Sequence, residues 1–216
     1  MGQLLRAFAG VILLVLGSAA GAATLSFQFN FVFSGIAPVG STPWASAVFT
    51  DVGTNLVRLE LDAGGLTGPE NVKQAYFNLD PALDPASLTI GFVQGDPGTQ
   101  ATNISMGANQ FMADGDGKFD LLFNFSPGSG FDAGESAVYE LSYAGSGVVS
   151  AASFDFLSAS AGGHGPFLAA LQVQNTGGGG ESAWIAPVAM PLPAPMALLA
   201  GGLLALLGAP RTRGRL

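Results

Sequence analysis

The feature that most constrains the fold is a run of alternating apolar and polar residues near the start of the chain. Leu25 and four phenylalanines occupy every second position up to Phe33, and Ser26, Gln28 and Asn30 lie between them. Successive side chains of a β-strand point to opposite faces of the sheet. The run therefore predicts a strand with one buried face and one solvated face.

The same two-residue period recurs along the chain, and no run of helical period is found. Glycine and proline residues separate the alternating segments, as they do in proteins built from short strands. Further strands are predicted at residues 57–62, 74–79, 88–92, 119–125, 139–143, 154–156, 167–174 and 182–185. About nine or ten such strands predict an all-β fold, a single antiparallel β-sandwich of jelly-roll or immunoglobulin-like type.

Composition excludes several classes of function. The 216 residues include no cysteine and one histidine, which excludes disulfide scaffolds, thiol nucleophiles and cysteine-ligated metals. Seven basic residues against fifteen acidic ones give a net charge of −8, the wrong sign for binding nucleic acid. Without disulfides, the packing of sixteen phenylalanines must stabilise the domain.

The N-terminus has the pattern of a secretory signal peptide. Arg6 precedes an apolar run at residues 7–16, and small residues continue to Ala23. Residues 1–23 are therefore predicted to be a signal peptide, with a short membrane anchor or a buried helix as the alternative. The predicted β domain at residues 24–189 holds three basic and all fifteen acidic residues, so its net charge is −12.

The C-terminus, residues 190–216, has three parts. A proline-rich segment ends at Pro195, an apolar run follows from Met196 to Ala209, and arginines end the chain. As a helix, the apolar run would extend about 21 Å, short of the roughly 30 Å hydrocarbon core, so it spans a membrane only marginally. The arginines at 211, 213 and 215 favour a cytoplasmic C-terminus. The alternative is an ordinary single-span anchor that is never processed.

This tripartite end resembles the PEP-CTERM class of sorting signals, and most closely its VPLPA variant. The resemblance implies export to the surface of a bacterium that makes exopolysaccharide, with an exosortase-type membrane protease as partner. This chain has Met190 where the variant usually has Val, and Thr212 and Gly214 interrupt its basic tail. The resemblance assigns the sorting motif to Pro191, Leu192, Pro193 and Ala194, and the cytoplasmic stop to Arg211, Arg213 and Arg215.

The predicted domain also resembles a recurring type of PEP-CTERM ectodomain. The similar segments are residues 72–88, 114–125, 131–139 and 165–185. Related chains usually have a histidine near Leu171, whereas the one histidine here is His164. The resemblance implies fold and location, and it carries no known activity.

Three carboxylates in the segment from Asp114 to Asp120 form a candidate calcium site, because Ca²⁺ prefers oxygen ligands on a glycine-containing loop. The third carboxylate is Asp116. Lys118 and Phe119 stand where an EF-hand needs an oxygen ligand and a glycine. The alternative is a hairpin turn whose acidic side chains are solvated.

Other candidate residues have weaker patterns. His164 lies among glycines, which favours an exposed loop over a general base, since no nucleophile elbow is present. The glycines at 177–180 predict a hairpin loop rather than a phosphate cradle. Four aromatic side chains could stack on sugar rings or belong to the core. These are Trp44, Tyr76, Tyr143 and Trp184.

Three functions are therefore considered. The first is a non-catalytic exported protein of the cell surface or extracellular matrix, without a cofactor and anchored in the inner membrane only as a precursor. The alternative is a carbohydrate-binding module for exopolysaccharide, assisted by calcium at the three aspartates. The third is a hydrolase, which requires a cleft where two acidic side chains converge.

Overall fold

The computed structural model describes residues 22–126 and 130–188. Nearly all of the predicted signal peptide and the whole predicted sorting signal, including Pro191–Ala194 and the three arginines, lie outside the described residues. Within the described ranges, no helix is long and apolar enough to cross a membrane.

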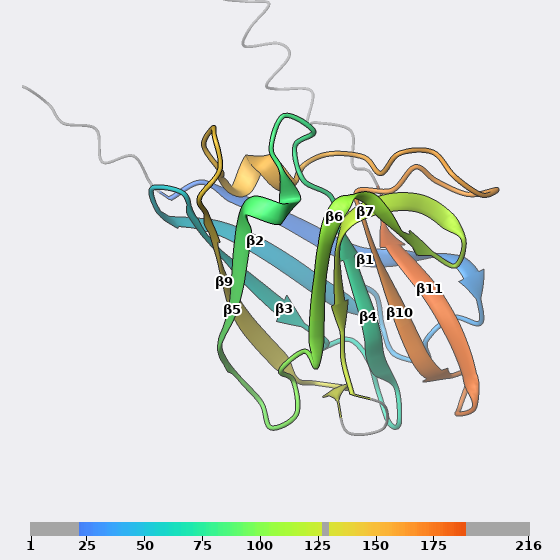
Figure 1. The fold of residues 1–216 in the computed structure, drawn as a ribbon. Coiled ribbons are helices and arrows are strands. Elements are labelled where there is room, and N and C mark those ends of the chain that lie inside the picture. The colour runs from blue at the N-terminus through green and yellow to red at the C-terminus, as the bar shows by residue number, and fades with distance from the viewer. Residues whose placement is uncertain (1–21, 127–129, 189–216) are drawn as a thin grey trace, which may run out of the picture.

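Eleven strands and two short 3₁₀ helices make up the domain (Figure 1). The strands are β1 (Thr24–Gly35), β2 (Ala45–Gly53), β3 (Leu56–Asp62), β4 (Asn71–Phe77), β5 (Leu88–Gly95), β6 (Asn103–Ala113), β7 (Asp116–Asn124), β8 (Phe131–Asp132), β9 (Ser136–Tyr143), β10 (Ala169–Thr176) and β11 (Glu181–Pro187). The 3₁₀ helices are η1 (Pro85–Ser87) and η2 (Ala151–Phe154).

All strands belong to one antiparallel sheet in the order β5-β9-β3-β2-β1-β11-β10-β4-β7-β6, and β8 pairs with β4. The predicted all-β antiparallel fold is confirmed. The difference from the predicted sandwich is that its two layers are parts of a single continuous sheet, which curves round as Figure 1 shows. The closer comparison with jelly-roll or immunoglobulin-like domains stays a prediction.

Strand β1 joins the two parts of this sheet. Residues Thr24–Phe29 pair with β2, and residues Phe29–Gly35 pair with β11. Two irregularities interrupt the second pairing, between Phe29 and Phe31 and between Val32 and Ser34. Bulges bend a strand and increase its twist, so β1 turns the corner between a first half-sheet (β5-β9-β3-β2-β1) and a second half-sheet (β11-β10-β4-β7-β6).

Aromatic side chains pack the two half-sheets together. Phe49 of β2 stacks on Phe154 of η2 with ring centroids 4.3 Å apart, and it meets Phe77 of β4 edge to face at 5.3 Å. Phe123 of β7 meets Tyr139 of β9 at 5.2 Å. We call this the inner cluster. Buried aromatic pairs of these geometries add about 0.5–1.5 kcal/mol each beyond the burial of their area.

A second apolar cluster, here called the outer cluster, lies on the other face of the second half-sheet. Its largest members are Phe33, Tyr76, Phe119, Phe167 and Trp184, all of which are buried. The segment between η2 and β10 covers it, since Phe167 stacks on Phe33 with centroids 4.3 Å apart. The strands β4, β10 and β11 of the second half-sheet are therefore buried on both faces over much of their length.

The bend in β1 corrects one sequence prediction. Residues 25–33 were expected to bury every second side chain on one face, but Phe31 is 46% exposed. The extra residue at Asn30, where the register with β11 shifts, turns Phe31 outward. The prediction of a strand at residues 154–156 is also wrong. The 3₁₀ helix η2 ends at Phe154, and the next strand of the described residues is β10.

Candidate ligand-binding site

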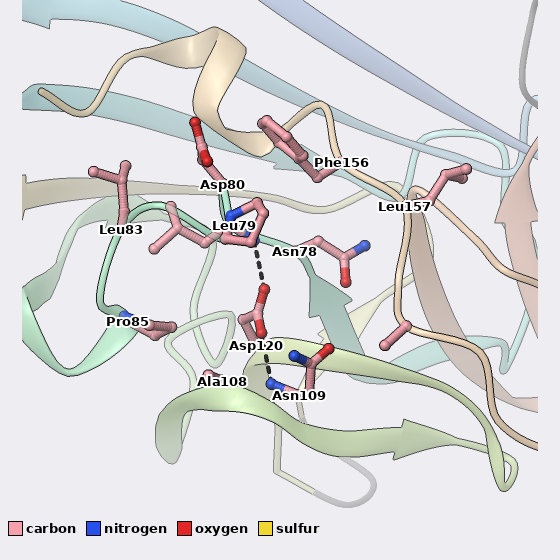
Figure 2. A pocket seen from close by; sticks show the side chains of 12 residues that line it. Asn78, Leu79, Asp80, Leu83, Pro85, Ala108, Asn109, Asp120, Phe156 and Leu157 are labelled. Carbon is pink, nitrogen blue, oxygen red and sulfur yellow. Dashed lines mark hydrogen bonds between the residues drawn. The ribbon is translucent and has the colours of Figure 1, made fainter. Parts of the chain in front are cut away.

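A pocket of about 270 Å³ opens beside the second half-sheet (Figure 2). Four segments distant in sequence form its walls: the loop after β4, the middle of β6, one residue of β7, and the stretch that follows η2. Its lining residues are Asn78, Leu79, Asp80, Pro81, Leu83, Pro85, Ala108, Asn109, Asp120, Phe156, Leu157 and Ala159.

Asp120 fixes two walls of this pocket. Its Oδ2 accepts a hydrogen bond from the backbone N–H of Leu79 at 2.8 Å, and its Oδ1 accepts one from the N–H of Asn109 at 2.7 Å. Figure 2 shows the Asp120 carboxylate between these two amides. Hydrogen bonds to a charged acceptor are the stronger kind, so this buried carboxylate holds the two segments at a fixed separation.

A bulge in β6 brings Asn109 to the pocket. Met106 pairs with Leu121 and Phe111 with Phe119, so the four residues between Met106 and Phe111 face a single residue of β7. Asn109 has a φ of 54°, in the left-handed region that asparagine tolerates better than most residues. β-Bulges of this kind redirect side chains near functional sites.

Asn78 anchors the third wall. Its Nδ2 donates hydrogen bonds to the carbonyl oxygens of Phe167 at 3.1 Å and Leu168 at 2.8 Å. The side chain thus ties the loop after β4 to the start of β10. The pocket wall is therefore held by hydrogen bonds from two directions.

The lining combines polar and apolar groups. Amides and carboxylates come from Asn78, Asp80, Asn109 and Asp120, whereas Leu83, Phe156 and Leu157 add apolar surface. A mostly apolar wall with a few placed polar groups is typical of small-molecule sites. The lining thus places hydrogen-bonding groups beside an apolar face.

The pocket also contains the two acidic side chains that a hydrolase would need, Asp80 and Asp120. Asp80 Oδ1, however, accepts the N–H of Ala82 at 2.8 Å, and both oxygens of Asp120 accept backbone amides. Figure 2 shows the two carboxylates on opposite sides of Leu79. They do not converge on a common point in the pocket.

The predicted calcium site is not assembled. Asp114 and Gly115 have φ values of 54° and 81° and form the two-residue turn between β6 and β7, as expected of an Asp-Gly hairpin. Asp116 and Asp120 accept hydrogen bonds from different segments. Among residues 22–126 and 130–188, no group of three His, Cys, Asp or Glu side chains could hold a metal ion.

Asp116 instead pairs with the one histidine. Its Oδ1 accepts the N–H groups of Gly163 at 2.6 Å and His164 at 2.9 Å, and its Oδ2 lies 2.8 Å from His164 Nδ1. These hydrogen bonds, first that from the His164 backbone, lower the pKa of Asp116 below its usual 3.8. Gly162 is required here because a Cβ would collide with Asp116 Oδ1.

The prediction that His164 lies on an exposed loop is confirmed, since its side chain is 57% exposed. Sequence reasoning missed its partner, because Asp116 lies 48 positions earlier in the chain. The run of glycines around His164 was the available signal, since a loop that wraps a carboxylate with successive N–H groups needs such residues.

The aromatic side chains considered for sugar stacking are all buried. Trp44, Tyr76, Tyr143 and Trp184 are 8%, 3%, 6% and 9% exposed. Trp44 Nε1 donates to the Gly40 carbonyl oxygen at 2.9 Å, as buried indoles usually require. The interpretation of these residues as core is confirmed. The glycines at 177–180 form the loop between β10 and β11, as predicted.

Comparisons with known proteins add little to this description. No protein-family model matches the chain, and no curated protein matches it. Among solved structures, it is similar to biomass-sensing modules from Rsgi-like proteins of Clostridium thermocellum, which resemble a family 3 carbohydrate-binding module of the cellulosome. The identity is 13%, the match covers 79% of this chain and 99% of that chain, and the TM-score is 0.34. Similarity this low carries no inference about fold or ligand.

Proposed function

We propose that this chain is a non-catalytic exported protein of the cell surface or extracellular matrix, sorted through its C-terminal signal. The observation that carries the proposal is the order of a proline-rich motif, a short apolar run and terminal arginines behind a signal-peptide pattern. An apolar run of about 21 Å makes a poor permanent anchor in a hydrocarbon core of roughly 30 Å. If sorting removes this apolar run, the run has to hold the precursor in the membrane only transiently, which accounts for its short length.

The described domain supports the non-catalytic part of the proposal. Buried acidic side chains serve backbone amides: Glu70 accepts the N–H groups of Val39 and Thr67 at 2.6 and 2.9 Å. Asp116 and Asp120 do the same. The Asp116–His164 pair has no serine or threonine hydroxyl hydrogen-bonded to the histidine among the described residues. A nucleophile activated by that histidine would need such a contact.

The proposal is tested by the intact mass of the protein recovered from the surface and medium of an exosortase-containing bacterium. We expect loss of the segment after about residue 194. A triple change of Arg211, Arg213 and Arg215 to Gln should leave the precursor unprocessed, and Arg58→Gln serves as the matched control. Recovery of the mature protein with Leu216 still attached would contradict sorting.

A second candidate function is carbohydrate binding at the pocket of Figure 2. The specific observation is that pocket's set of fixed amide and carboxylate groups beside an apolar wall, a combination suited to the hydroxyls and the C–H face of a sugar. Exopolysaccharide is the ligand class that the location suggests.

A glycan array separates this candidate from a purely structural role. Binding should fall at least tenfold in Asn78→Ala and stay unchanged in Asp116→Asn, which lies outside the pocket. A chelator should leave binding unaffected, because the three aspartates of the predicted calcium site are not brought together. If neither acidic nor neutral glycans bind, carbohydrate binding is contradicted and the structural role remains.

A further inference from the structure

The loop after β4 gives the pocket of Figure 2 few free hydrogen-bond donors. Pro81 and Pro85 line the pocket, and proline has no backbone N–H. The N–H of Asp80 donates to the carbonyl oxygen of Ser153 at 2.7 Å, and the N–H of Leu83 donates to the carbonyl oxygen of Asp80 at 2.8 Å. A ligand in the pocket therefore finds these amides already bonded.

The charge of the lining is negative. Asp80 and Asp120 each contribute a carboxylate, and no Lys, Arg or His among the described residues lines the pocket. Neither carboxylate has an ion-pair partner in residues 22–126 and 130–188. Lys118 lies two positions before Asp120 on β7, but it is not part of the lining. The pocket thus combines carboxylates with an absence of balancing cations.

Asn78 presents an unpaired acceptor to the pocket. Its side chain is only 2% exposed. Carbonyl oxygens can only accept hydrogen bonds, so those of Phe167 and Leu168 fix the amide nitrogen of Asn78 toward them. The amide oxygen then faces the other way, and Figure 2 shows it on the side of Asn109. No described residue donates to this oxygen. Buried side-chain acceptors are normally bonded, so the oxygen indicates a ligand that donates.

We propose that the pocket binds a sugar that carries a protonated amino group, with its ammonium group against Asp80 and a ring hydroxyl donating to Asn78 Oδ1. Oδ1 of Asp80 accepts the N–H of Ala82, and no described residue donates to its Oδ2. An ammonium group has three donors and no acceptor, and its hydrogen bonds to a carboxylate are charge-assisted. The inference rests on the second candidate function, carbohydrate binding at this pocket, and names the class of sugar.

The rest of the wall suits the ring of such a sugar. Leu83, Phe156 and Leu157 supply apolar surface, against which the C–H face of a sugar can pack. The volume of about 270 Å³ lies just below the roughly 300–1,000 Å³ of sites for drug-sized ligands. The pocket therefore has room for one ring rather than for a chain of sugars.

A sugar that carries a carboxylate is disfavoured in the same position. Its charge would face Asp80 and Asp120, and like charges brought together oppose binding. The predicted domain as a whole carries a net charge of −12, which adds to the repulsion at long range. Acetylation of the amino group would remove the positive charge and with it the attraction to Asp80.

The loop after β4 also contains a matched control for Asp80. Asp84 precedes a proline, as Asp80 does, and its Oδ1 accepts the N–H of Ala86 at 3.0 Å, two positions later. Asp84 is not part of the lining. A change to Asn keeps the accepting oxygen of either turn and removes one negative charge. Asp80→Asn removes that charge from the pocket, whereas Asp84→Asn removes it from outside.

Isothermal titration of the full-length chain with four methyl glycosides tests the proposal. The sugars are glucosamine, N-acetylglucosamine, glucose and glucuronic acid, at about pH 6, where an amino group is protonated. At low salt the glucosamine glycoside should bind about tenfold or more tightly than the glucose glycoside, and the other two should not exceed glucose. This preference should fall below about threefold in Asp80→Asn and in high salt, and it should persist in Asp84→Asn.

The outcomes separate this inference from carbohydrate binding itself. Equal affinity for glucosamine and glucose would overturn the inference, as would a preference that survives Asp80→Asn or high salt, and carbohydrate binding would stand in each case. A preference lost equally in Asp84→Asn would overturn it too, because the overall charge of the domain would then be the cause. If none of the four glycosides binds, carbohydrate binding at this pocket is contradicted together with the inference.

Discussion

The two half-sheets differ in what lies on their outer faces. In β3 of the first half-sheet, Val57, Leu59 and Leu61 are buried while Arg58 and Glu60 are exposed. In β11 of the second, every residue from Ala183 to Pro187 is buried. Buried and exposed residues therefore alternate along a strand whose sheet has one face in solvent. The alternation disappears where both faces of the strand are covered.

The cover over the second half-sheet is attached by its backbone. Lys118 and Ala159 exchange hydrogen bonds of 2.8 and 3.1 Å, and Ser158 N–H donates to the Phe167 carbonyl oxygen at 2.8 Å. The covering segment is therefore irregular in shape but tied to β7 by backbone hydrogen bonds. This part of the molecule has three layers, and the first half-sheet contributes to only one interface.

The largest expected effect comes from the inner cluster. Phe49→Ala should lower the free energy of unfolding by about 3–5 kcal/mol, because the side chain is fully buried between Phe77 and Phe154 and its removal leaves a cavity. Urea unfolding monitored by tryptophan fluorescence measures the change. A loss below about 1 kcal/mol would mean that the two half-sheets do not depend on this contact.

The same substitution in the outer cluster sharpens the comparison. Phe33→Ala should cost about half as much, because Phe33 packs against the irregular covering segment, which can collapse into the space more readily than paired strands can. Phe33 contacts Phe167 and Trp184. Equal losses for Phe33→Ala and Phe49→Ala would show that the cover is as rigid as the sheet.

Asp116 gives the attachment of the cover a dependence on pH. Its pKa is lower in the folded protein than the usual 3.8, so its contribution to stability is present above about pH 4 and is lost as the pH falls below that value. The stability difference between wild type and Asp116→Asn should therefore shrink in acid. Asp114→Asn, at the tip of the same hairpin, is the control, and a pH series of thermal unfolding measures both.

The smallest effect is expected on the open face of the first half-sheet. Arg58 pairs with Glu140 at 2.8 Å, with side-chain exposures of 47% and 35%. Arg58→Gln should cost less than about 1 kcal/mol, since exposed ion pairs contribute little. High salt should reduce the difference further. A loss comparable to that of Phe33→Ala would contradict the contrast between the two outer faces.

Sequence predicted the strands whose faces differ in polarity, such as β1, β3 and β4. It missed β2, β6 and the two-residue β8. In β6 the bulge between Met106 and Phe111 destroys the two-residue period. The pocket could not be predicted from the sequence either. Asp120 is hydrogen-bonded to Leu79 across 41 positions, and Asn78 to Leu168 across 90. Contacts at such separations depend on strand order, which local spacing does not encode.

The place of β11 in the sheet determines how the domain bears force. It lies between β1 and β10 and pairs with both. Hydrogen bonds between antiparallel strands run perpendicular to the strand axis. Tension applied at Val188 along that axis therefore acts on the hydrogen bonds on both sides of β11 together. These bonds must break by shear at the same time and not one after another.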